Sequence, residues 1–176
     1  MSSLFKILER TFLSILGSCL YWLNIYEAGI KCFSRCLNIT GSYLGHSYYH
    51  KRIGFGLVQL HKFEAAIYHF EQRLSANNND LETLFYLGGC FAQIALTIPK
   101  GAEDRNNLLL KAETYIEKSE PEFASWNWGY YVTLGILKKL LGKREEARAC
   151  YLKALAIEPK AQMAKDRLAE LEADAR

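Results

Sequence analysis

Two pairs of side chains have a spacing that could form a chemical site: Cys32 with Cys36, and His46 with His50. The members of each pair are four residues apart, so on a helix both would share one face and could bind the same metal ion. A structural zinc site needs four ligands, and no second pair with suitable spacing lies nearby in the sequence. We therefore expect Cys36 to pack in the interior and the two histidines to lie at an exposed helix start, with no bound metal.

No pattern in the sequence is typical of an enzyme. Glycine-rich phosphate loops and the nucleophile elbows of hydrolases both follow a strand, and this sequence predicts no strand. Glu117, Glu120 and Glu122 surround Pro121 and form a short acidic patch, which we expect to be a solvated face. We predict no catalytic residue and no cofactor.

Trp126 and Trp128 flank Asn127 near a predicted boundary between structural units. Two interpretations are open. The indole rings either pack in the core or form an aromatic anchor for a partner, since tryptophan is frequent at the centre of protein interfaces.

The composition is that of one globular domain. The chain has 176 residues, of which 50% are apolar and 23% are charged, unlike a disordered chain. The formal net charge is +3, and basic residues are interleaved with acidic ones along most of the sequence, which does not favour nucleic-acid binding. Five cysteines without framework spacing indicate a reducing compartment. We expect a cytoplasmic location, or the stroma or matrix of an organelle.

The N-terminal segment from Thr11 to Tyr26 is uncharged and rich in aromatic and aliphatic residues. Its sixteen residues are fewer than the roughly 20 that a membrane span needs. Lys6 and Arg10 precede it, as basic residues precede the apolar part of a signal peptide. We favour a helix that packs on the rest of the chain over a removed signal, and we also weigh contact with a membrane surface.

A repeated pattern runs through the chain. Gly54 is followed by Ala66 twelve residues later, and Gly135 is followed by Ala147 at the same interval. Large side chains come next at equal spacing, for example Phe70 after Ala66. With these positions the sequence resembles the tetratricopeptide repeat family, whose 34-residue unit is a helix–turn–helix with small residues where its helices cross.

Two further units resemble the same repeat. Gly88 lies 34 residues after Gly54, but its partner Ala112 comes 24 residues later, so about twelve residues are inserted, which we place in a turn-rich loop over 98–104. At the front, Gly17 is followed by Gly29 after twelve residues. This first unit is degenerate because glycine replaces the usual alanine.

The resemblance implies an all-α fold, a right-handed α-solenoid of helix–turn–helix repeats with a C-terminal capping helix. We predict a single domain over 1–176, whose parts are a degenerate repeat over about 10–43, a repeat over 47–80, a repeat with an insertion over 81–127, a repeat over 128–161 and a capping helix over 162–176.

In this family the first helices of successive repeats line a concave groove that binds a partner. Carried over by position, the resemblance implies a partner-binding set made of Tyr48, Lys51, Phe55, Val58, Gln59, Glu82, Phe85, Gln93, Val132, Ile136 and Lys139. The alternative for each of them is packing against an adjacent helix. The set is mainly apolar, which suits an extended apolar segment or an amphipathic helix.

One branch of the family binds the acidic chain ends of chaperones through lysine, asparagine and arginine side chains. Lys51 matches the first position of that clamp, but Phe55, Glu82 and Tyr86 occupy positions that need asparagine or lysine. We predict that this ligand is not bound in that way.

These observations favour a non-catalytic protein–protein interaction module, an adaptor or assembly factor that holds a partner segment in its groove. One alternative is a fixed subunit of a membrane-associated complex, docked through the apolar N-terminus. Another is a secretion-type chaperone for apolar substrates. In each case the partner is a protein and not a nucleic acid, and the sequence leaves the oligomeric state undetermined.

Overall fold

The computed structural model describes residues 3–39 and 43–174, and these residues form ten α-helices and no strand. The predicted all-α class is therefore confirmed. Residues 40–42 of the predicted first repeat and 175–176 of the predicted capping helix lie outside the described residues. The helices are α1 (Ser3–Trp22), α2 (Tyr26–Ile39), α3 (Tyr43–Gln59), α4 (Phe63–Ala76), α5 (Leu81–Thr97), α6 (Glu103–Lys118), α7 (Glu120–Phe123), α8 (Trp128–Leu140), α9 (Arg144–Ile157) and α10 (Gln162–Ala173).

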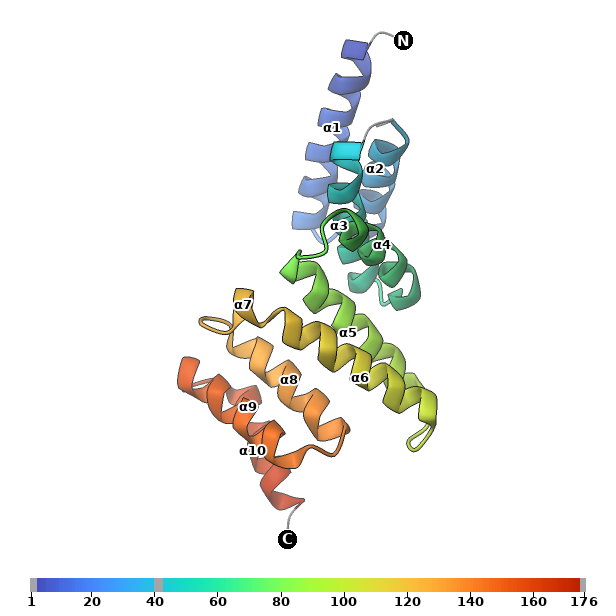
Figure 1. Cartoon of the computed structure of the whole chain (residues 1–176). Coiled ribbons are helices and arrows are strands. Elements are labelled where there is room, and N and C mark those ends of the chain that lie inside the picture. The colour runs from blue at the N-terminus through green and yellow to red at the C-terminus, as the bar shows by residue number, and fades with distance from the viewer. Residues whose placement is uncertain (1–2, 40–42, 175–176) are drawn as a thin grey trace. The chain divides into compact units, whose positions relative to one another are not determined.

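The chain divides into two compact units, Met1–Tyr86 and Leu87–Arg176, with the boundary inside α5. In unit 1, α1 packs on α2, α2 on α3, and α3 on α4. In unit 2, α6 packs on α8, α8 on α9, and α10 on both α8 and α9. The helices form four pairs, α1 with α2, α3 with α4, α5 with α6, and α8 with α9. The two helices of a pair run antiparallel and are joined by a short turn, as Figure 1 shows.

Small residues in the first helix of each pair allow the second helix to approach closely. A methyl group in place of the glycine hydrogen would lie only 2.5–2.9 Å from a large side chain of the second helix, the four contacts being Gly17 with Phe33, Gly54 with Phe70, Gly88 with Ile116, and Gly135 with Tyr151. All four large side chains are fully buried. Burial of a side chain of this size contributes about 1.5–3 kcal/mol, so the repeated glycine allows a large apolar contribution in every pair.

The turns inside the four helix pairs share one backbone feature. In each turn a residue with positive φ lies two positions before the second helix: Asn24, His61, Gly101 and Gly142. Left-handed backbone costs an ordinary residue about 1 kcal/mol or more, so asparagine and glycine suit this position and histidine is the costly exception. In three of the turns the next residue donates its backbone N–H to the oxygen five positions earlier (Ile25 to Leu20, Lys62 to Leu57, Lys143 to Lys138), whereas the α5–α6 turn is two residues longer and lacks this bond.

The inserted residues of the third pair are mostly helical. Seven residues lead from Gly54 to the turn residue His61, but thirteen lead from Gly88 to Gly101. On the other side of the turn, Ala112 lies eleven positions after Gly101, whereas Ala66 lies five positions after His61. The helices α5 and α6 are therefore both longer at their turn ends, and α6 already begins at Glu103. The added residues extend the two helices instead of forming a loop, because a helix satisfies the backbone hydrogen bonds that a loop would leave unpaired.

Two histidines meet between α3 and α4. We expected His50 to lie with His46 at an exposed helix start, but Nδ1 of His50 lies 2.9 Å from Nδ1 of His69 and both rings are half-buried. The antiparallel packing of α3 on α4 creates this pair, which sequence spacing cannot reveal. Burial lowers the pKa of His69 to about 4 and also lowers that of His50, which the neighbouring His46 lowers further.

Adjacent glycines of α5 provide a matched test of the close approach. In Gly88→Ala the new methyl group would lie 2.6 Å from Ile116 Cγ1 and 2.9 Å from the backbone oxygen of Ala112, whereas at Gly89 nothing lies within 4 Å. We expect Gly88→Ala to lower the free energy of unfolding by about 1–3 kcal/mol and Gly89→Ala to raise it by up to about 1 kcal/mol. Urea unfolding followed by circular dichroism measures both. Equal effects would contradict the packing role of Gly88.

The histidine pair predicts acid sensitivity well above the range in which the carboxylates protonate. The folded-state pKa of His69 is lower than the unfolded value of about 6.5, so the unfolded chain binds more protons between these values. Stability is therefore intact near pH 7 and falls as the pH drops from about 6.5 toward 4. We expect a loss of about 2 kcal/mol by pH 4.5, after reduction for partial solvent screening. Thermal unfolding of His69→Gln over the same pH range should show a much flatter dependence; an unchanged slope would contradict the assignment.

Candidate functional site

The partner-binding residues predicted in unit 1 lie on α3 and at the start of α5. Tyr48, Gln59 and Glu82 are accessible, and Phe55, Val58 and Phe85 are half-buried. Tyr48 is 45% exposed with its ring 5.4 Å from that of Tyr49. These side chains therefore offer an aromatic surface with few charges, accessible mainly at Tyr48.

Phe55 is part of an aromatic cluster inside unit 1. Its ring centroid lies 6.0 Å from that of Tyr21, 6.3 Å from Tyr26 and 5.5 Å from Tyr86. Tyr86 also stacks on Phe70 at 6.0 Å. Aromatic pairs at these distances add to stability, so Phe55 holds α1, α3 and α5 together whether or not it contacts a partner.

Lys51 is engaged by two carboxylates. Its Nζ lies 3.0 Å from Asp80 Oδ1 and 2.6 Å from Glu82 Oε2. Asp80 also accepts hydrogen bonds from Arg73 Nε and from the backbone N–H of Thr83. Burial alone would raise the pKa of Asp80, but these hydrogen bonds lower it to about 2. This network joins α3, α4 and the start of α5, and it neutralises the one lysine that matched the chaperone clamp.

The predicted residues of unit 2 have different environments. Gln93 on α5 is exposed, whereas Val132 on α8 is only 2% exposed and so cannot contribute to a surface. Ile136 packs against a buried cluster of Ala147, Tyr151 and Leu171, and Lys139 pairs with Asp174 at 2.9 Å. Ile136 and Lys139 also line one cavity of about 470 Å³.

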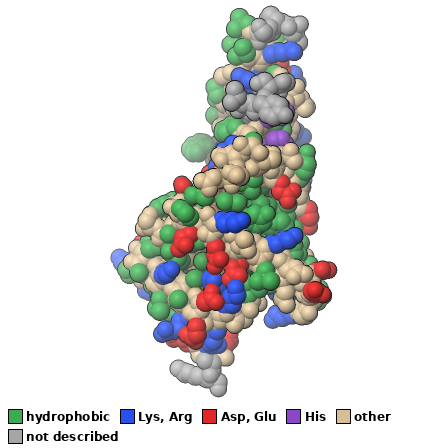
Figure 2. All heavy atoms as spheres, viewed as in Figure 1, with side chains coloured by type: hydrophobic (Ala, Val, Ile, Leu, Met, Phe, Trp, Pro, Cys, Tyr) green, Lys and Arg blue, Asp and Glu red, His purple; other side chains and the backbone are tan. Residues whose placement is uncertain are grey.

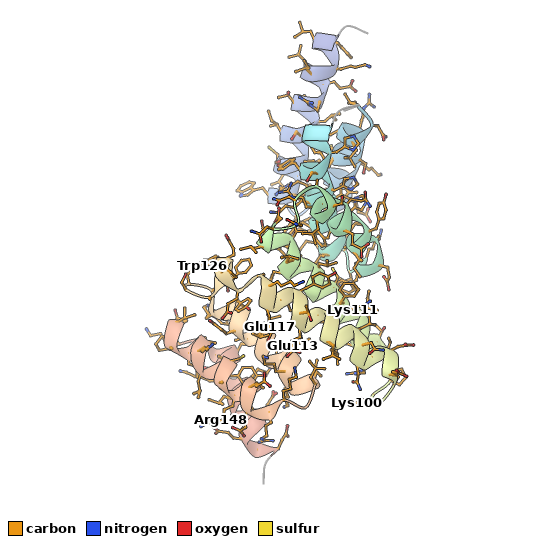
Figure 3. The ribbon with its side chains drawn as sticks, in the orientation of Figure 1. Lys100, Lys111, Glu113, Glu117, Trp126 and Arg148 are labelled. Carbon is orange, nitrogen blue, oxygen red and sulfur yellow. The ribbon has the colours of Figure 1, made fainter. Side chains whose placement is uncertain are left out.

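A buried lysine links three helices of unit 2. Lys138 on α8, whose side chain is 8% exposed, lies 3.0 Å from Glu113 and 2.9 Å from Glu117 on α6, and 2.6 Å from Glu146 on α9. Figure 3 shows Glu113 and Glu117 on α6. Burial opposes the charge on Lys138, but the hydrogen bonds to the three glutamates raise its pKa. Glu113 is buried together with Lys138, whereas Glu117 and Glu146 are about half exposed, so the Lys138–Glu113 pair is the part of the cluster that most strongly aligns α6 with α8.

One face of α1 is apolar and exposed. Leu4, Leu8, Phe12, Ile15 and Trp22 are 60–84% exposed, and their spacing puts them on one side of the helix. The opposite side carries Gly17 and Tyr21, which pack against α2. None of the helices in residues 3–39 and 43–174 combines the length and the apolar content of a membrane span.

The cysteines singled out in the sequence show no sign of a chemical site. Cys36 is buried, as expected, and its thiol contacts the backbone oxygen of Arg10 at 3.5 Å. Among the described residues, no group of three histidine, cysteine, aspartate or glutamate side chains is arranged to hold a metal ion.

Asn127, between the two tryptophans, caps α8 by accepting a hydrogen bond from the backbone N–H of Tyr130. Trp126 is 61% exposed, so its ring remains available to a partner, whereas Trp128 is half-buried.

On one face of unit 2, charged side chains do not form a surface of one sign (Figure 2). On the face drawn in Figure 2, basic and acidic side chains are interspersed over the part of the view that Figure 1 assigns to unit 2. A surface of this kind differs from the continuous basic stripe that nucleic-acid-binding modules present.

Comparison with known proteins identifies one repeat directly. Residues 129–160 match the family model of the tetratricopeptide repeat. This segment contains most of α8 and all of α9, with the close contact between Gly135 and Tyr151. No curated protein sequence matches the chain significantly.

Three solved structures illustrate the likeness over most of the chain. A thermophilic tetratricopeptide-repeat protein of Thermus thermophilus is 20% identical, with a TM-score of 0.70, and the match covers 94% of this chain and 82% of that one. YrrB, described as having an unusual peptide-binding site, is 19% identical with a TM-score of 0.67, covering 85% of this chain and 69% of its own. The first such domain of Spaghetti (RPAP3), bound to the HSP90 peptide SRMEEVD, is 17% identical with a TM-score of 0.61, covering 74% and 93%. The chain therefore has the fold of the tetratricopeptide-repeat proteins, and its residues 129–160 are a repeat of that family.

Proposed function

We propose that this protein is a non-catalytic interaction module, an adaptor or assembly factor that holds a segment of a partner protein. The observation that carries the proposal is the repeat fold with accessible aromatic side chains on its first helices, above all Tyr48 on α3. Two proteins of the same fold, YrrB and RPAP3, are described as binding peptides. Within each unit, the proposed partner-binding residues are those predicted from the sequence, without the buried Val132 of unit 2.

An acidic chain end held by Lys51 is not the ligand that we propose for unit 1. Asp80 and Glu82 both pair with Lys51, and an incoming carboxylate would meet their charges. An apolar or aromatic segment that packs on Tyr48, with a polar contact to Gln59, suits these side chains better.

Two exposed tyrosines of the same helix pair allow a matched cross-linking test. Tyr48 lies on the first helix, α3, and Tyr68 on the second, α4, and they are 45% and 57% exposed. We expect a benzoylphenylalanine at position 48 to cross-link one dominant polypeptide in the native host, and the same group at position 68 to give none. Tyr48→Ala should weaken recovery of that partner at least fivefold, since truncated aromatic anchors cost about 1 kcal/mol or more.

Circular dichroism should show Tyr48→Ala and its control Tyr68→Ala to be folded, because neither side chain is buried. Equal cross-linking from positions 48 and 68, or full partner recovery by Tyr48→Ala, would contradict the proposal that the first helices bind the partner.

The exposed apolar face of α1 favours a second candidate function, a fixed subunit of a membrane-associated complex docked through the N-terminus. An unpartnered row of leucine, isoleucine and aromatic side chains is unfavourable in water, and it would be stabilised by an apolar surface of another subunit. The face is distinct from the side of α1 that packs on α2.

The triple variant Leu8→Ser, Phe12→Ser, Ile15→Ser tests this second candidate. These side chains are 60–64% exposed, so we expect the fold to remain stable while the protein moves from the membrane fraction to the supernatant. The matched control is Leu96→Ser, Leu110→Ser, Leu152→Ser, which changes leucines that are 42–46% exposed elsewhere. Wild-type protein found wholly in the supernatant, or released by high salt alone, would contradict apolar docking.

A further inference from the structure

The cavity of about 470 Å³ in unit 2 is lined by several cations and by one buried hydroxyl that lacks a hydrogen-bond partner. It is lined by residues of the α5–α6 turn, of α6, α8 and α9, and of α10. Its volume lies within the range of small-ligand sites, about 300–1,000 Å³. Its lining residues are Lys100, Gly101, Arg105, Asn106, Ile136, Lys139, Leu140, Tyr151, Arg167 and Glu170.

The lengthened α5–α6 hairpin supplies one wall of this cavity. Lys100 and Gly101 lie at its turn, and Arg105 and Asn106 lie in the first turn of α6. Figure 3 shows Lys100 at the end of the hairpin. These four residues reach the cavity because the hairpin is lengthened by the inserted residues. The cavity is therefore a property of this chain and not of the repeat in general.

The tyrosine of the last repeat contributes a hydroxyl with no partner. Tyr151 is 0% exposed, and its hydroxyl makes no hydrogen bond within the described residues. Burial raises the pKa of this hydroxyl to about 12, so it is a protonated donor near neutral pH. A buried hydroxyl without a partner is costly. An acceptor bound in the cavity would relieve that cost.

The cations of the cavity are only partly compensated. Glu170, the one carboxylate in the lining, lies 2.9 Å from Arg167 and 4.0 Å from Lys139, and Asp174 also binds Lys139. Arg105 is buried and donates to the backbone oxygen of Ile98 at 2.6 Å.

Within residues 3–39 and 43–174, no carboxylate is ion-paired with Arg105 or with Lys100. Burial of a cation without a counter-charge is unfavourable, which leaves the hairpin side of the cavity short of an anion. Ile136 and Leu140 give the cavity an apolar part next to these cations.

We propose that this cavity binds a carboxylate of a partner peptide, with the apolar part of the same residue against Ile136 and Leu140. The inference rests on the proposed protein-binding function and specifies the chemistry of the bound segment. Arg105 and Lys100 supply the positive charge and Tyr151 donates a hydrogen bond. The carboxylate comes from a chain end or from an acidic side chain, and the test separates the two sources.

The test titrates the full chain with three small probes and measures binding from the shifts in its ¹H–¹⁵N spectra. N-acetyl-leucine mimics a chain end, N-acetyl-glutamate α-amide mimics an acidic side chain, and N-acetyl-leucine amide lacks the charge. For probes of this size we expect dissociation constants on the order of 1 mM for one or both acids, with shifts around Arg105 and Tyr151, and at least tenfold weaker binding of the amide.

Tyr151→Phe removes only the hydroxyl and keeps the ring that packs on Gly135. We expect this variant to be at least as stable as the wild type and to bind the acids about tenfold more weakly. Lys100→Gln should weaken binding about two- to threefold, and Lys111→Gln, on α6 but outside the cavity lining, should leave it unchanged.

Equal binding of acid and amide, no shift with either acid at about 50 mM (well above the expected dissociation constant), or wild-type affinity in Tyr151→Phe would each overturn the proposal. None of these outcomes changes the cross-linking expected at Tyr48. Conversely, binding of the acids without any cross-linked partner would leave the carboxylate site standing and remove the proposed interaction function.

Discussion

The contact between a glycine of one helix and a large side chain of the next is the constraint on which the rest of this structure depends. In each pair there is no room for a methyl group on the glycine, while Phe33, Phe70, Ile116 and Tyr151 are completely buried. Short helices are marginal alone and take their stability from such packing. The same contact sets the distance and the phase of the two helices, and hence which side chains of the first helix remain accessible.

Charged clusters complete the alignment that apolar packing begins. In unit 1, Asp80 joins Lys51 and Arg73; in unit 2, Lys138 joins three glutamates. Buried charges are tolerated only when they are paired and hydrogen-bonded, so each cluster accepts one arrangement of its helices. The cluster in unit 1 also bears on the proposed function, because Lys51 already pairs with Asp80 and Glu82.

Three of the accessible features described above are the ones on which the proposals rest. They are the aromatic surface around Tyr48, the apolar face of α1 and the cavity next to the α5–α6 hairpin. The first two are apolar and suit protein segments, while the cavity combines cations with an unpartnered hydroxyl. Repeat proteins bind through extended surfaces of this kind because each repeat contacts only its neighbours and leaves its outer faces open.

The sequence by itself determined the helical class and the phase of the repeats, because small and large side chains recur at fixed intervals along the chain. It also indicated the fold of the family before any contact was known. Local spacing carries this information since neighbouring helices of a repeat array are also neighbours in sequence.

Only the tertiary structure decided where individual side chains point and what lies between helices. It placed His69 beside His50, buried Val132 and exposed the apolar face of α1. Part of the segment over 98–104, which we expected to be a loop, belongs to the lengthened α5–α6 hairpin. It also brought Arg105 and Tyr151 to one cavity. His50 and His69 are 19 positions apart, and Arg105 and Tyr151 are 46 positions apart. A periodic pattern specifies the face of a helix but not the partner that covers it.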